Sequence, residues 1–139
     1  MNSAMTIDDL HAFMAEAFVQ VAGDFVVEEL EPTRLRLRMK VGADNLRPGG
    51  TVSGPSMFSL ADVAVYLMTL SRIGPQALAV TTNCSIDFMR KPAPRDLIAE
   101  CRLLKLGRAL SVGDVMIYSD GQPEPVARAT LTYSIPPAA

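Results

Sequence analysis

The clearest pattern in the chain is a strict alternation of apolar and cationic residues over residues 33–41. Period two over this length predicts a β-strand with one buried face and one face in water. A row of cations could also follow a phosphate backbone, but we interpret it as the solvated face of the strand. The apolar set and the cationic set are Leu35, Leu37, Met39 and Val41 against Arg34, Arg36, Arg38 and Lys40.

Two further segments have helical periodicity. Residues 6–22 carry apolar side chains at helical spacing after Thr6, and Gly23 is a natural stop, so we expect an amphipathic helix there. A second helix is expected to begin around residues 53–56, with a body over residues 57–70 that is apolar on most of its circumference. A helix of this kind is buried by its domain and does not rest on the surface.

The rest of the chain has the alternation and turn residues of β-strands. Strands are expected at residues 25–31, 33–41, 78–89, 97–106, 109–119 and 126–135. The short connections suggest antiparallel neighbours. A sheet of about six strands covers one apolar helix only by curling around it. We therefore predict a single α+β domain over residues 1–139, with free sheet edges that favour dimerisation.

Composition narrows the class of protein. The chain has 139 residues and a net charge of −2, too weak a field to hold a phosphate backbone, so we expect no nucleic-acid partner. The apolar stretch 57–70 is too short to span a bilayer, and no membrane association is expected. Two cysteines make no disulfide framework, which suggests a cytoplasmic protein with free thiols. His11, the one histidine, is interpreted as a helix-surface residue, and no Cys/His cluster has metal-ligand spacing.

Chemistry is expected on the second helix, where Asp62 is the only charge. Ser59, Asp62, Tyr66 and Thr69 form a polar stripe that either meets solvent or a partner, or holds a partly desolvated carboxylate able to activate water or attack a carbonyl. Periodicity leaves both alternatives open. Gly54 lies at the start of the helix, where a free backbone amide could polarise a carbonyl oxygen.

Four motifs in order resemble the hotdog-fold thioesterases of the phenylacetate-pathway (PaaI) type. The segment RPGGTVSGPSMFSLAD, residues 47–62, resembles the loop and central-helix start of that family, whose usual form is Pro-Gly-Gly, His-Gly-Gly and Leu-Ala-Asp. SIDFMRKPA at 85–93, KLGR at 105–108 and VARAT at 126–130 resemble its later landmarks. The resemblance covers residues 46–133 and implies a hotdog fold: a curled antiparallel sheet around a long central helix.

The same resemblance implies hydrolysis of acyl-CoA to a free acid and CoA, with no cofactor beyond the coenzyme A of the substrate. Asp62 matches the catalytic base or nucleophile, Gly54 the amide that polarises the thioester carbonyl, and Thr81 a position on a strand of the partner subunit that holds the carboxylate or water. The turn residues Arg90, Lys91 and Arg108 match positions near the CoA phosphates. The family implies a homodimer with shared active sites and, as a further expectation, a dimer of dimers.

Some positions depart from the family pattern. Ser53 replaces the usual His, Pro55 the second glycine, and Arg47 falls where relatives carry an Asn or Gln that positions water. Asn45, two residues away, could take that part if the loop shifts. Arg47, Ser53 and Asn45 are thus candidate substrate-binding residues. The alternative function is a non-catalytic hotdog dimer that binds acyl-CoA or another fatty ligand.

Overall fold

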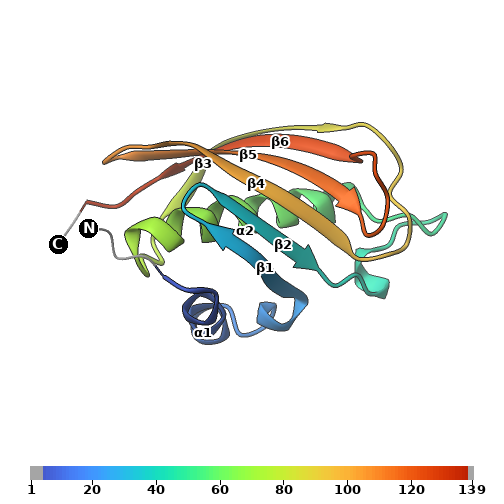
Figure 1. The fold of residues 1–139 in the computed structure, drawn as a ribbon. Coiled ribbons are helices and arrows are strands. Elements are labelled where there is room, and N and C mark those ends of the chain that lie inside the picture. Colours follow the sequence, from blue (N-terminus) through green and yellow to red (C-terminus); the bar gives the residue numbers. More distant parts are fainter. Residues whose placement is uncertain (1–4, 138–139) are drawn as a thin grey trace.

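A curled six-stranded antiparallel sheet encloses a long helix (Figure 1). The computed structural model describes residues 5–137. The sheet order is β1-β2-β4-β5-β6-β3. This is the predicted hotdog fold with an added N-terminal helix. In chain order the main elements are α1 (Ile7–Ala17), β1 (Phe25–Glu31), β2 (Arg34–Met39), α2 (Gly54–Ile73), β3 (Val80–Phe88), β4 (Leu97–Leu106), β5 (Leu110–Ser119) and β6 (Ala127–Ser134).

Helix α2 forms the centre of the hydrophobic core, as its apolar circumference predicts. Leu60, Ala64 and Leu67 are fully buried against the concave face of the sheet. By length and composition α2 could also cross a membrane. However, two-thirds of its apolar 18-residue window is buried inside the protein. Ser53 caps its first turn by accepting a hydrogen bond from the Ser56 amide, and Gly74 ends it with a φ of 96°.

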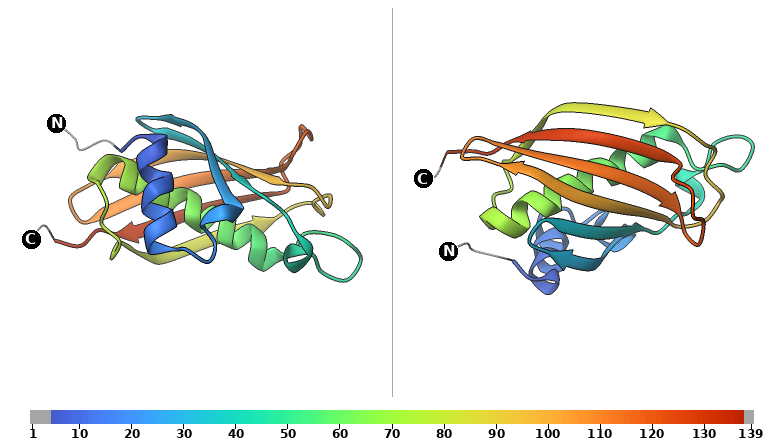
Figure 2. Two further views of the ribbon diagram at one scale, coloured as in Figure 1. Left: turned by 90° about the horizontal axis from the view of Figure 1, so that it is seen from below. Right: turned by 45° about the horizontal axis from the view of Figure 1, so that its top comes forward.

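Helix α1 lies across α2 on the side that the sheet leaves open (Figure 2). Thr6 and Asp9 form a capping box at its start. The helix ends at Ala17, five residues before the predicted end, because the chain turns at Phe18 and packs this ring edge-on against Tyr66 of α2. Tertiary packing here overrides the continuing helical periodicity.

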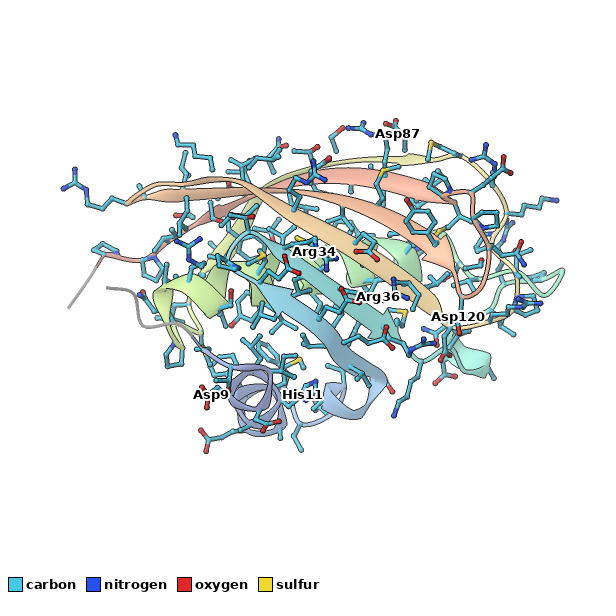
Figure 3. The ribbon with its side chains drawn as sticks, viewed as in Figure 1. Asp9, His11, Arg34, Arg36, Asp87 and Asp120 are labelled. Atoms are coloured by element: carbon cyan, nitrogen blue, oxygen red, sulfur yellow. The ribbon has the colours of Figure 1, made fainter. Side chains whose placement is uncertain are left out.

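His11 connects α1 to the sheet, which corrects its interpretation as a helix-surface residue. Its Nε2 accepts a hydrogen bond of 3.0 Å from the backbone amide of Val27 in β1. Figure 3 shows His11 between the helix and this strand. An acceptor nitrogen carries no proton, so the contact uses the neutral imidazole.

The cationic face of β2 belongs to an ion-pair network and not to a phosphate track. Arg36 contacts Glu28 and Glu100 from the strands on either side. These cross-strand pairs lie on the outer face of the sheet, where Arg34, Arg36 and Asp120 are labelled in Figure 3. The network also includes Arg34 with Glu29, Glu31 and Glu100, and Arg38 with Glu28, Asp96 and Asp120.

Strand β3 is not the neighbour of β4, although a short Pro-rich segment joins them. It forms the edge of the sheet beside β6, and residues 89–96 cross the end of the sheet to reach β4. The register of β3 shifts between Thr81 and Asn83. Thr81 pairs with the buried Tyr133, and Cys84 with the buried Leu131, so both face inward. Strict alternation over the predicted strand 78–89 places Thr81 on the face opposite Cys84, and this expectation is wrong because of the shift.

A close approach of α2 to β5 predicts a sensitive position. A Cβ built on Gly113 of β5 would lie 2.9 Å from Val65 Cγ2. Gly113→Ala should therefore destabilise the fold by about 1 to 3 kcal/mol, measured by urea unfolding. Gly23→Ala is the control, since a Cβ there meets nothing within 4 Å. Adding Val65→Ala should give a less than additive loss; full additivity would contradict the proposed clash.

Candidate active site

The carboxylate of Asp62 is held by two hydroxyl groups. Thr81 Oγ1 donates to Asp62 Oδ1 at 2.6 Å, and the Tyr133 hydroxyl donates to the same oxygen at 2.7 Å. The Tyr133 hydroxyl also lies 3.1 Å from the backbone carbonyl oxygen of Asp62. Among residues 5–137, no group is found donating to the second carboxylate oxygen, Oδ2. Asp62 is half-buried, so one oxygen is fixed while the other is left for chemistry.

Thr81 reaches Asp62 within one chain. The resemblance placed Thr81 on a strand of the partner subunit, whereas the hydroxyl contact described here is with Asp62 of the same chain. The reason is the shift in β3, which pairs Thr81 with Tyr133 and turns both side chains toward α2. A Thr in the predicted alternation would instead face away from Cys84 and the helix.

Sequence reasoning missed Tyr133. The signal was present, because Ala127, Ala129, Leu131 and Tyr133 alternate on the inner face of β6. A buried tyrosine needs a partner for its hydroxyl. The sequence could not identify that partner, since Asp62 is 71 residues away in the chain.

Asp62, Thr81 and Tyr133 line an apolar pocket of about 450 Å³. Its volume is within the usual range for a small-molecule site. Met14 and Phe18, from α1 and the turn after it, form part of the wall. Helix α1 therefore covers this pocket, a role the sequence left open. The other lining residues are Val21, Phe25, Val63, Tyr66, Ala77, Ala79 and Val80.

The polar stripe of α2 does not form a solvent-facing row. Thr69 is fully buried, donates to the Val65 carbonyl oxygen and shares a hydrogen bond of 2.8 Å with Ser111 of β5. Tyr66 lines the pocket and donates to the Ala77 carbonyl oxygen. Of the two alternatives for Asp62, the geometry favours the partly desolvated carboxylate.

At the start of α2 the capping pattern leaves Gly54 as the free amide donor. Ser53 Oγ accepts from the Ser56 amide at 3.3 Å, and Pro55 has no N–H to offer. Within the described residues we find no acceptor for the Gly54 N–H. The Phe88 ring lies beside it, 3.5 Å from where a Gly54 Cβ would be. The positive end of the helix dipole at this amide favours a negatively charged oxygen.

Asn45, and not Arg47, contacts the helix start. Its amide Nδ2 donates to Ser56 Oγ at 3.1 Å, and its Oδ1 accepts from the Gly42 amide at 2.8 Å. Ser53 Oγ also donates to Ser56 Oγ. Arg47 is exposed in the turn that contains Gly49 and Gly50, both with positive φ. No shift of the loop is needed for Asn45 to reach the first turn of α2.

The three basic turn residues do not form one cluster in a single chain. Arg90 and Lys91 follow β3 at the end of the sheet where α2 begins, and Arg90 donates to the Pro125 carbonyl oxygen. Arg108 lies in the β4–β5 turn at the opposite end. The register from Leu110 to Ile117 alone separates these ends by about 23 Å. Within one chain, a single phosphate group therefore cannot contact Arg108 together with Arg90 or Lys91.

Gly54 and Asp62 also lie far apart within one chain. They are eight residues apart on one helix, which is about 12 Å along its axis. An amide that binds a carbonyl oxygen and a carboxylate that acts at the same carbon must both lie within about 3 Å of that group. The two residues of one chain cannot meet this condition together.

The surroundings of the two cysteine thiols raise the pKa of each. Cys101 is buried, and this burial raises its pKa to about 12. Cys84 is half-exposed on the inner face of β3, where burial and then the charge of Asp62 raise its pKa. Within residues 5–137, no group of three or more His, Cys, Asp or Glu is placed to hold a metal ion.

Comparison with known proteins identifies the family to which the chain is similar. The model of the thioesterase superfamily matches residues 49–126. A crystal structure from a Silicibacter species, named as a candidate thioesterase, is 53% identical, with a TM-score of 0.90, 99% of this chain covered and 95% of that one. A variant of the phenylacetic acid degradation protein PaaI from Thermus thermophilus is 30% identical, with a TM-score of 0.71 and coverage of 87% and 100%.

More distant structures share the fold alone. A hypothetical thioesterase protein with coenzyme A from Streptococcus pneumoniae is 21% identical, with a TM-score of 0.75 and coverage of 95% of this chain and 98% of that one. No curated protein matches the chain.

Thiol labelling tests the surroundings of Asp62. At pH 8 a disulfide reagent should modify Cys84 and leave Cys101 unmodified until the protein unfolds. Asp62→Asn should speed the labelling of Cys84, because removing the negative charge lowers the pKa of that thiol and increases its thiolate fraction. Asp87→Asn is the control, since Asp87 lies on the outer face of β3 and pairs with Arg128. An unchanged labelling rate in Asp62→Asn would contradict the effect of the Asp62 charge on the Cys84 thiol.

Proposed function

The chain belongs to the thioesterase superfamily, and from this we propose that it hydrolyses acyl-CoA thioesters to a free carboxylic acid and CoA. The single observation that carries the proposal is the half-buried Asp62 carboxylate in the wall of an apolar pocket. A carboxylate in such a place is partly desolvated and is held ready by two hydroxyls.

The chemistry needs two groups. Asp62 either removes a proton from the attacking water or attacks the thioester carbonyl carbon itself. The C–S bond then breaks, and CoA leaves as a thiolate that takes up a proton. On the water route this step gives the free acid directly, whereas direct attack leaves the acyl group on Asp62 as a mixed anhydride, which a water molecule hydrolyses to the acid and the free carboxylate. The Gly54 amide donates to the carbonyl oxygen, on which negative charge develops in the transition state. Asn45, beside the helix start, is a candidate for binding the water or the substrate.

We propose that each active site combines the Asp62 of one chain with the partner subunit's Gly54. The separation of about 12 Å along α2 supports this arrangement, because the two groups of one chain cannot act on one carbonyl. Edge strand β3 supports a dimer, since its outer edge is unpaired within one chain. Val80 and Phe88 on this strand are about half exposed, which favours burial against a second copy.

The pocket behind Asp62 is proposed to bind the acyl group. Its wall is mostly apolar and includes the rings of Phe18, Tyr66 and Tyr133. A volume of about 450 Å³ suits a small or medium acyl group and not a long chain. The basic residues Arg90, Lys91 and Arg108 are proposed to contact the CoA phosphates, with Arg108 contributed by another subunit.

A panel of acyl-CoA thioesters, from acetyl through phenylacetyl to long-chain, tests the activity. Free thiol release should be greatest for acyl groups that fill the pocket. Asp62→Asn should lower kcat by at least about 100-fold while substrate binding persists, since it removes the base or nucleophile. Asp87→Asn is the matched control on the outer face. Binding without turnover in the wild type would instead support the non-catalytic acyl-ligand protein.

Mixed dimers test the shared site. Gly54→Pro removes the amide, and Ser53 already has the extended conformation that a following proline requires. We expect a loss of about 100-fold in kcat. Gly54→Ala keeps the amide, with its Cβ in ordinary contact with Phe88, and should keep most activity.

Gly54→Pro and Asp62→Asn should each lack most activity when expressed separately. Co-expression of the two variants in equal amounts should restore about one quarter of wild-type activity. Half of the dimers are then mixed, and each has one intact site of two. No restoration would mean that both groups act from the same chain.

A further inference from the structure

The two oxygens of the Asp62 carboxylate are not equivalent in this fold. Oδ1 accepts from both Thr81 and Tyr133, at 2.6 and 2.7 Å. We find no donor to Oδ2 in the described part of the chain. Hydrogen bonds to an ionised acceptor are stronger than those between neutral groups. The side chain is therefore fixed by one oxygen and leaves the other free.

Tyr133 is itself held rigidly. It is 3% exposed, pairs with Thr81 across β3 and with Ser111 across β5, and packs its ring 5.7 Å from that of Tyr66. Its hydroxyl approaches both the carboxylate and the backbone carbonyl oxygen of Asp62. These two contacts restrain the side chain and the backbone of one residue together.

Tyr133 also remains a donor throughout the working pH range. Burial first, and then the hydrogen bond and charge of Asp62, raise the pKa of Tyr133 far above its usual value. A hydroxyl that keeps its proton and lies next to a carboxylate can only donate to it.

Resting on the proposed function, we propose that Tyr133 is a positioning residue for the reaction. Its hydroxyl, together with that of Thr81, holds Oδ1 so that Oδ2 alone meets the water or the thioester carbonyl. Tyr133 takes no proton from the substrate and touches no reacting atom. It acts by fixing the orientation of Asp62, where an error of about 1 Å can cost about 100-fold in rate.

The competing explanation is that Asp62 merely satisfies the hydroxyl of a buried tyrosine. The backbone carbonyl of Asp62 alone could do this at 3.1 Å. The shorter bond to the carboxylate, on the oxygen that Thr81 also contacts, favours a role in holding the carboxylate.

Tyr133→Phe separates the two explanations, because it keeps the ring and removes only the hydroxyl. We expect kcat to fall about 10- to 100-fold with little change in KM. Tyr118→Phe, on the outer face of β5, is the control and should leave kcat and KM unchanged. A change in KM alone, or no change, would overturn the proposal.

Thr81→Val provides a second test. If both hydroxyls hold the same oxygen, Tyr133→Phe and Thr81→Val should be coupled, and the double variant should lose a different factor in kcat from the product of the two single losses. Independent losses, each confined to stability, would indicate two structural hydrogen bonds and overturn the proposal.

A crystal structure of Tyr133→Phe tests positioning without any substrate. The Asp62 carboxylate should rotate or occupy two orientations, whereas the wild type has one. An unmoved carboxylate in the variant would overturn the proposal even if the enzyme is active. A carboxylate that moves in a protein that hydrolyses no thioester would instead overturn the proposed function and leave the positioning contact intact.

Discussion

The structure depends on one constraint: helix α2 is too apolar to face water and must be enclosed. A single sheet can enclose a helix only if it curls, and the curl forms the concave face on which Leu60, Leu67 and their neighbours pack. The helix approaches the sheet so closely that β5 carries Gly113 opposite Val65. The pocket and the ordering of the site residues follow from this enclosure.

The one carboxylate on α2 is the exception to that constraint. A charged group on a core helix is costly unless it is hydrogen-bonded. Here Thr81 and Tyr133 provide the hydrogen bonds, and the pocket wall keeps Asp62 only half-exposed. The hydrogen bonds that stabilise the buried side of the carboxylate also orient it. The contacts to Oδ1 therefore serve both the stability of the fold and the proposed chemistry.

The fold also limits what one chain can do. Gly54 has the free amide at the start of α2, but about 12 Å of helix axis separates it from Asp62. The unpaired edge of β3, with Val80 and Phe88 exposed, provides a surface where a second copy could bring these groups together. By contrast, the outer face of the sheet is occupied by paired charges such as Arg36 with Glu28 and Glu100, which hold the register of three strands.

The sequence by itself determined the periodic features. Alternation in residues 34–39, the apolar body of α2 and the order of helices and strands are local patterns, and together with the family resemblance they predicted the α+β hotdog fold and pointed to Asp62 and Gly54 as candidates. Local signals failed where packing between distant segments competed with them. Helix α1 ended early because Phe18 packs on Tyr66. Strand β3 lies at the far edge of the sheet, where it pairs with β6 and not with β4, its neighbour in the chain.

Only the tertiary structure decided what surrounds Asp62. The irregular register of β3 turned Thr81 inward, and strand pairing brought Tyr133 to the carboxylate from 71 residues away. The tertiary structure likewise placed Asn45 at the start of α2 and Arg108 far from Arg90. Periodicity specifies which face of an element is buried, whereas register and strand order specify which buried groups meet, because those depend on contacts between residues distant in the chain.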